Sequence, residues 1–237
     1  MKPRTTINSL HVAFAAIALA VGILAISDTT QARKALPETS PEGLKLVPKT
    51  KLSAVYLRDG VNFSGYDKVM ILDCYVAFKK NWQRDQNSDT RSPRVSDDDV
   101  TRIKTDLAEE FKKVFTKELT AKGQTVVTAP GSDVLILRPA VIDLDVTSPD
   151  TMDPGITRSY SATAGQATLF LELYDSVTSE LLARVYDAEQ VEGMGGYFSV
   201  RNKASNYTDA ERMLKKWAGI IGTHLQAARE SGGTPAK

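Results

Sequence analysis

A long amphipathic pattern in residues 96–123 constrains the fold of this chain more than any other feature. Ser96 and Asp99 have the spacing of a capping box, and Gly123 supplies a helix end. Between them, apolar residues recur at spacings of three and four, which places them on one face of a helix of about seven turns. They are Val100, Ile103, Leu107, Phe111, Val114, Phe115 and Leu119. The pattern predicts one long helix that buries this face against a second layer.

A second amphipathic helix is predicted near the carboxyl end. Thr208 and Glu211 again have the spacing of a capping box. The apolar residues that follow share one helix face, and they are Met213, Leu214, Trp217, Ala218, Ile221 and Leu225.

Apolar runs predict the strands. Residues 68–78 are apolar on both faces, which is typical of a central strand. Residues 160–174 and 181–191 alternate on either side of a short polar segment and predict an antiparallel hairpin. Residues 133–146 form another strand, with an edge position or a bulge expected at Pro139. Its expected inward face is Val134, Ile136, Ala140, Ile142, Leu144 and Val146.

The order of these elements predicts the fold class. A strand, a helix, three or four strands and a final helix indicate an α+β fold, with a mostly antiparallel sheet of about five strands and two long amphipathic helices packed on it. This is a two-layer or three-layer α/β sandwich. We expect one domain at residues 44–230, a flexible leader at residues 33–43 and a disordered tail at residues 231–237.

The amino-terminal residues predict export. Lys2 and Arg4 precede an apolar run at residues 10–26, and Thr30-Gln31-Ala32 resembles a signal peptidase site. We interpret residues 1–32 as a signal peptide and expect a periplasmic or cell-envelope location. The alternative is an uncleaved membrane anchor, because the run approaches the roughly 20 apolar residues of a spanning helix. We expect contact with a membrane only through such an anchor.

Charge and composition exclude several classes of function. The chain has 30 Lys and Arg against 29 Asp and Glu, so nucleic acid is not an expected partner. Cys74 is the sole cysteine and lies in an apolar run, where we interpret it as a small buried residue. His224 is the one histidine after residue 32 and is interpreted as a packing residue. One cysteine and one histidine cannot supply a structural zinc site, and we predict no catalytic residue, metal or cofactor.

Basic and aromatic side chains in residues 79–94 are the first candidates for contact with a partner. They are Lys79, Lys80, Trp82, Arg84 and Arg91, and the second candidates are Tyr197 and Phe198 in a glycine-rich loop. An amphipathic aromatic residue beside cations suits an anionic surface or a protein surface. The alternative is a solvated loop whose Trp82 folds back onto the domain.

These features favour a non-catalytic exported protein that binds another envelope protein or a cell-wall component. One alternative is a cell-wall glycan hydrolase that uses Asp143 and Asp145, whose carboxylates are expected about 7 Å apart on one strand face. Such a pair is more typical of the solvent face of an edge strand. The other alternative is a surface protein held in the membrane by residues 10–26.

Several segments together resemble the bacterial envelope family called domain of unknown function 3313 (DUF3313). The residues that carry the resemblance stand in the required order, and they are Gly43-Leu44, Ala54-Val55-Tyr56, Gly65-Tyr66, Phe78, Trp82, Val95-Ser96, residues 130–135, residues 172–181 and Trp217-Ala218. The resemblance implies no catalytic residue. The resemblance implies a lipoprotein, but no cysteine lies near the end of the apolar run here to carry a lipid.

Overall fold

The structure, a computed structural model, describes residues 36–88, 94–146, 159–161, 163–192, 199–201 and 203–230. These residues belong to one compact unit that starts at Leu36. The predicted signal peptide at residues 1–32 and the predicted tail at residues 231–237 lie outside the described residues. No helix in the described ranges is long and apolar enough to span a membrane.

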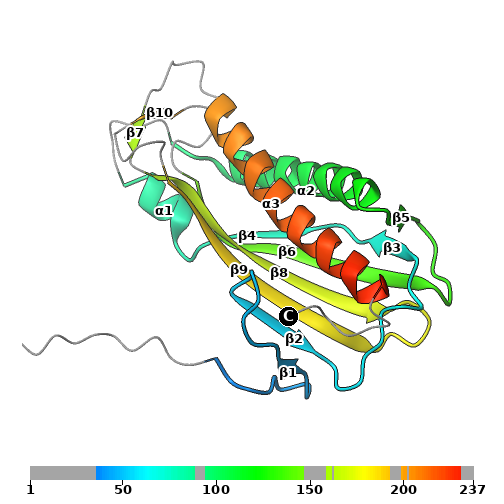
Figure 1. The fold of residues 1–237 in the computed structure, drawn as a ribbon. Coiled ribbons are helices and arrows are strands. Elements are labelled where there is room, and N and C mark those ends of the chain that lie inside the picture. Colours follow the sequence, from blue (N-terminus) through cyan, green and yellow to red (C-terminus); the bar gives the residue numbers. More distant parts are fainter. Residues whose placement is uncertain are drawn as a thin grey trace, which may run out of the picture. The chain divides into compact units, whose positions relative to one another are not determined.

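The described chain contains one large sheet, one small sheet and three helices (Figure 1). The strands of the large sheet are β1 (Lys45–Leu46), β2 (Ala54–Leu57), β3 (Lys68–Ile71), β4 (Tyr75–Phe78), β5 (Thr125–Val126), β6 (Val134–Val146), β8 (Thr163–Asp175) and β9 (Leu181–Glu192). The small sheet pairs β7 (Ser159–Ser161) with β10 (Ser199–Arg201). The helices are α1 (Trp82–Gln86), α2 (Asp97–Ala121) and α3 (Lys203–Glu230).

The α+β class is confirmed, but the predicted sheet of about five mostly antiparallel strands is wrong. The sheet has eight strands in the order β1-β2-β9-β8-β6-β3-β5, with β4 also paired to β6. It is mixed, because β3 and β4 run parallel to β6, and β5 runs parallel to β3. Among the additional strands is β1, which has only two residues and is too short for alternation to reveal. The crossover through α2 makes β4 and β6 parallel.

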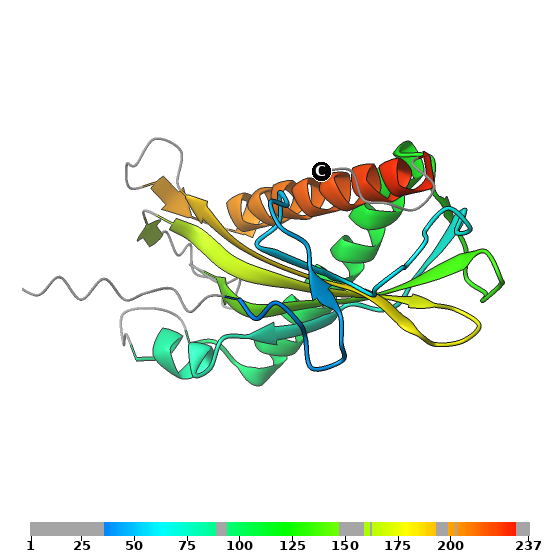
Figure 2. The same ribbon diagram turned by 60° about the horizontal axis from the view of Figure 1, so that its bottom comes forward.

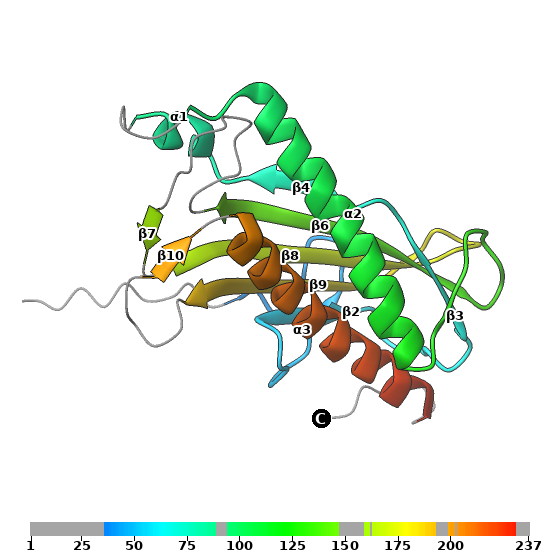
Figure 3. The same ribbon diagram turned by 90° about the horizontal axis from the view of Figure 1, so that it is seen from above.

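Both long helices lie on the same face of the sheet (Figures 1 and 3). The predicted start of α2 is confirmed, since Asp99 donates its N–H to Ser96 Oγ at 3.1 Å and its carboxylate accepts the Ser96 N–H at 3.0 Å. The predicted end is confirmed by Gly123, which follows the helix with a φ of +79°. The chain therefore forms a sandwich of two layers.

The predicted start of the last helix is wrong. α3 begins at Lys203, so Thr208 and Glu211 lie inside it rather than at a cap. Glu211 instead pairs with Lys215 one turn later, at 2.8 Å. The predicted apolar face is confirmed, because all six of its residues are buried.

The run at residues 68–78 forms two strands instead of one. β3 pairs with β6 as far as Leu137, and β4 resumes the pairing at Ala140. Pro139 lies opposite this interruption, where its lack of an N–H leaves no ladder bond unmade. The proline was expected at an edge or a bulge, and it lies instead in an inner strand beside a break in the neighbouring strand.

The inward face predicted for residues 133–146 is out of phase. Leu135, Leu137 and Val141 belong to the main core, whereas Ile136 and Ile142 are only half-buried. Asp143 has a φ of +52° and lies in a bulge, after which Leu144 points to the core. Both faces of this strand are apolar, so alternation alone could not choose between them.

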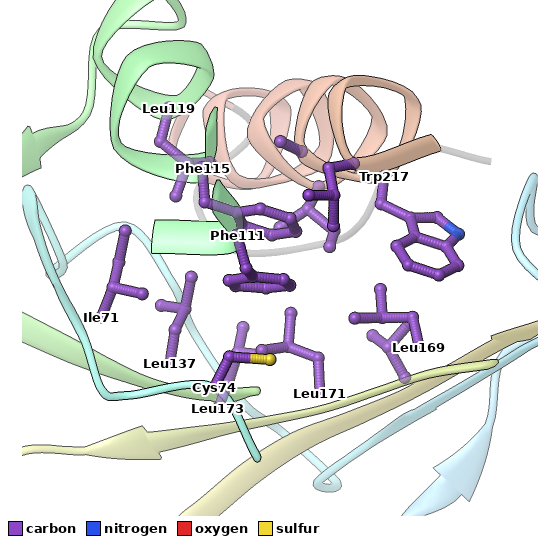
Figure 4. Packing of buried hydrophobic residues seen from close by; sticks show 14 of the residues in the cluster. Ile71, Cys74, Phe111, Phe115, Leu119, Leu137, Leu169, Leu171, Leu173 and Trp217 are labelled. Atoms are coloured by element: carbon purple, nitrogen blue, oxygen red, sulfur yellow. The ribbon is translucent and has the colours of Figure 1, made fainter. Parts of the chain in front are cut away.

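The main core lies between the helices and β3, β4, β6, β8 and β9 (Figure 4). Phe111 and Phe115 of α2 stack with ring centroids 3.8 Å apart. Trp217 of α3 is fully buried, and its indole N–H donates to Asp187 of β9 at 2.9 Å. Asp187 also accepts the backbone N–H of Ser53 at 2.8 Å, so one carboxylate joins α3, β9 and the start of β2.

The predicted hairpin is confirmed as β8 and β9, which pair antiparallel along their length. Asp175 holds its turn by accepting the N–H groups of Val177 and Thr178 at 2.9 and 2.6 Å. Hydrogen bonds from the Thr178 backbone and the Tyr66 hydroxyl lower the pKa of Asp175 to about 2.

Candidate functional site

The first candidate contact residues lie around α1, and the structure separates them. Trp82 is 1% exposed; its ring stacks on Phe78 at 3.9 Å, and its indole N–H donates to the Val146 carbonyl at 3.3 Å. The Trp82 side chain therefore packs on the domain and is not on the surface. This agrees with the alternative interpretation of the loop given above. Lys80 and Arg84 are exposed. Lys79 pairs with Asp145.

Three other candidates, Arg91, Tyr197 and Phe198, lie outside the described residues. The acidic pair of the hydrolase alternative is described. Asp143 lies in the bulge, whereas Asp145 lies beyond it and is engaged by Lys79. The regular spacing on one strand face, on which that alternative depended, is therefore absent.

Cys74 and His224 do not form a reactive site. Cys74 is buried, as predicted, and burial raises the pKa of its thiol to about 12, so the nucleophilic thiolate is not populated at neutral pH. His224 is half-buried on α3. Among the described residues, no group of three His, Cys, Asp or Glu side chains is placed to hold a metal ion.

The strongest cluster of polar and aromatic groups lies on the sheet face opposite the helices. We call this surface the open face and define it by Tyr75, Arg138, Phe170, Glu172, Tyr174, Arg184 and Tyr186. In the described chain no helix covers it, and only the segment that contains β1 lies across it near β2 (Figure 2). Strand register aligns its side chains in rows, since paired residues share a face.

Two such rows cross the sheet. In one, Arg138 of β6 pairs with Glu172 of β8, which pairs with Arg184 of β9. In the other, Tyr75 of β4 is followed by Ala140, Phe170 and Tyr186 on successive strands. The open face thus places a charged row beside an aromatic row.

Glu172 is the centre of the charged row, and its side chain is 2% exposed. Its Oε2 accepts hydrogen bonds from Arg138 Nε at 2.8 Å and from the Tyr174 hydroxyl at 2.9 Å. Its Oε1 accepts from Arg184 Nη2 at 2.7 Å. Arg184 also binds Glu42 at 2.6 Å, so the network continues into the segment before β1. A buried carboxylate with this many donors is fully paired.

The pKa values of this network follow from those contacts. Burial raises the pKa of Glu172, but hydrogen bonds from Arg184, Arg138 and Tyr174 outweigh burial and hold it below its ordinary value. The hydrogen bond from Arg184 lowers the pKa of Glu42 to about 2. The network is therefore ionised at neutral pH.

Aromatic rings on either side of the charged row hold its two arginines. The Arg138 guanidinium lies 5.2 Å from the Tyr174 ring centroid, and that of Arg184 lies 5.5 Å from the Phe170 centroid. Phe170 and Tyr186 are tilted against each other at 5.0 Å. Cations at these distances are attracted by the ring faces. Both guanidinium groups are thus fixed by a carboxylate and a ring together.

Exposure distinguishes the two ends of the charged row. The Arg184 side chain is 11% exposed, whereas that of Arg138 is 56% exposed. Only Nε and Nη2 of Arg138 donate to Glu172, so Nη1 makes no hydrogen bond within the described residues. Tyr75, in the neighbouring row, is 66% exposed. Arg138 is therefore a fixed side chain that solvent reaches, and Tyr75 is an exposed ring in the neighbouring row.

Sequence reasoning did not single out the charged row. A signal was present, because Glu172 is the one charged residue in the strand predicted at residues 160–174. The hairpin turn at residues 175–180 would have placed Arg184 opposite Glu172, but the pairing of Arg138 depends on β6, which is distant in sequence.

A family model matches residues 39–221, and its description is "Protein of unknown function (DUF3313)". No curated protein matches the chain in sequence.

Several solved structures are similar to part of this chain. The PelC dodecamer from Paraburkholderia phytofirmans has a TM-score of 0.37 and 12% identity, covering 70% of this chain and 95% of that one. Protein XCC0632 from Xanthomonas campestris has a TM-score of 0.41 and 8% identity, with coverages of 75% and 94%. A minor lipoprotein from Acinetobacter baumannii has a TM-score of 0.34 and 10% identity, with coverages of 69% and 95%. We draw no functional conclusion from these likenesses.

Proposed function

This chain belongs to the DUF3313 family, and from that membership we propose that it is a non-catalytic, exported envelope protein that binds another envelope protein through the open face. The observation that carries the proposal is an exposed arginine, Arg138, which Glu172 and the Tyr174 ring hold in place, with the exposed Tyr75 in the neighbouring row. Arginine and tyrosine are the residue types that most often dominate protein interfaces.

Preorganisation supports this use of the surface. A long arginine side chain ordinarily loses rotamer freedom when it binds. Glu172 and the Tyr174 ring already hold Arg138, so its side chain has lost most of this rotamer freedom before it binds. The unused Nη1 can donate to a carbonyl or carboxylate of the partner, and the Tyr75 ring offers apolar area beside it.

The edge strands of the sheet are short, which makes the face of the sheet the better candidate for the binding surface. β1 and β5 have two residues each, and β4 has four. Such short edge strands offer few unpaired backbone groups for strand addition. Leu72, three residues before Tyr75 in the sequence, is 37% exposed and is a further exposed apolar side chain in this part of the chain.

A variant with Leu72→Ala and Tyr75→Ala tests the proposal. We expect the recovery of a specific envelope protein with the tagged chain, measured by quantitative mass spectrometry, to fall about tenfold, as is typical when interface anchors are truncated.

The matched control is Val177→Ala with Tyr207→Ala, which also removes one exposed tyrosine and one exposed aliphatic side chain. It should leave recovery unchanged, and both variants should keep the wild-type circular dichroism spectrum. Equal recovery with both double variants would contradict a role for the open face.

A further inference from the structure

A second feature, on the helix side of the sheet, is not used by the proposed function. A pocket of about 580 Å³ lies between the carboxyl-terminal half of α3 and the helix-facing side of β2, β8 and β9. Protein interiors have few voids larger than a water molecule. Pockets for small ligands measure about 300–1,000 Å³, so this space has the size of a binding site.

The walls of the pocket are apolar. α3 contributes Ile221 and Leu225, β9 contributes Val185, and β2 contributes Val55 and Leu57. Phe63 supplies an aromatic wall. Such a surface suits a flexible hydrocarbon and gives a polar ligand nothing to bind.

The basic residues that line the pocket come from two segments of the chain. Lys49 and Lys51 belong to the segment between β1 and β2, and His224 belongs to α3. Both lysines are exposed, and neither forms an ion pair within the described part of the chain. No aspartate or glutamate is among the described residues that line the pocket. Positive charge is therefore uncompensated there.

Burial and the nearby charge of Lys51 together lower the pKa of His224. The imidazole is accordingly neutral at pH 7, where it can share a hydrogen bond with an anion. Lys51 and His224 line the same pocket, so both are placed to contact one head group.

We propose that this pocket binds one long-chain fatty acid, with the hydrocarbon chain between α3 and the sheet and the carboxylate at Lys49, Lys51 and His224. The apolar walls select a hydrocarbon, and the unpaired ammonium groups select a negative head group. This inference does not depend on the open face, because the two surfaces lie on opposite sides of the sheet.

Binding of cis-parinaric acid, a fluorescent fatty acid, to the delipidated protein tests the proposal. We expect saturable binding of one molecule per chain, displaced by palmitate. Hexadecanol, which has the same chain length without the charge, should displace it about tenfold less well, because it loses the charge-assisted hydrogen bonds. Equal displacement by the two compounds, or better displacement by a phospholipid with two acyl chains, would overturn the proposal.

Two sets of variants locate the site. Lys49→Gln with Lys51→Gln should weaken palmitate binding about tenfold. Ala227→Phe, from the pocket side of α3, should abolish binding by filling the space, whereas Gln226→Phe, at the exposed position next to it, should not. Unchanged binding in the lysine variant or in folded Ala227→Phe would overturn the assignment.

A measurement on the wild-type protein keeps the proposal testable even where a variant fails to fold. With isoleucine methyl groups labelled for NMR, palmitate should shift the signal of Ile221, which lines the pocket, and leave that of Ile136, on β6 away from the pocket, in place. A shift at Ile136 with none at Ile221 would contradict the proposal.

Discussion

Trp217→Ala is expected to lower the free energy of unfolding by about 3–5 kcal/mol, the range measured when a buried tryptophan or phenylalanine is cut to alanine. Trp217 is fully buried where α3 meets the sheet, and it gives its N–H to the buried Asp187. The substitution leaves a cavity and removes a donor from a carboxylate that has no access to water. Urea unfolding followed by circular dichroism measures the change.

Two matched variants separate the causes of this loss. Trp217→Phe keeps most of the ring and removes the N–H, so it should lose less than Trp217→Ala. Tyr75→Ala removes an aromatic ring that is 66% exposed and should cost less than about 1 kcal/mol. A loss in Trp217→Ala no larger than in Tyr75→Ala would contradict the packing of α3 described above.

Glu172→Ala is expected to lower the free energy of unfolding by about 3 kcal/mol, the lower end of the range for removing one partner of a buried ion pair. The loss should not be larger, because Arg138 stays half-exposed and Arg184 keeps Glu42. A triple variant with Arg138→Met, Glu172→Leu and Arg184→Met removes the three charges of the row together. It should be close to the wild type in stability, since it leaves no buried charge unpaired, and Glu42, which loses Arg184, is 43% exposed to solvent.

The same carboxylate predicts an acid dependence. The folded protein holds the pKa of Glu172 below its ordinary value of 4.5. The contribution of ionised Glu172 to stability is therefore complete above about pH 4.5. It is lost as the pH falls through the pKa that Glu172 has in the folded protein. Glu172→Gln should make the free energy of unfolding fall less steeply below pH 4.5. An unchanged acid slope would show that folding does not lower the pKa of Glu172.

Local patterns predicted those parts of the fold that depend on neighbouring residues. α2 begins at the predicted cap because Ser96 and Asp99 bond each other, and the hairpin of β8 and β9 closes through the Asp175 turn. The inward face of β6 could not be predicted, because both of its faces are apolar. The break between β3 and β4 depends on Pro139, which is more than 60 residues away in sequence.

The candidate site was harder to predict, because it also depends on residues that are distant in sequence. The open face unites residues of β4, β6, β8 and β9, and the pocket unites α3 with the segment before β2. Trp82 has the composition of a contact residue, but its partners Phe78 and the Val146 carbonyl bury it. Of these two partners, Val146 is 64 residues away in sequence, and no local pattern contains that contact.

Photo-crosslinking in cells tests most directly the central claim that the open face binds another envelope protein. The photoreactive p-benzoylphenylalanine is placed in the full chain instead of Tyr75, on the open face, or instead of Glu109, at an exposed position on α2. We predict a discrete adduct with another envelope protein from position 75 and none from position 109. The absence of an adduct at position 75, or the same adduct from both positions, would contradict the account.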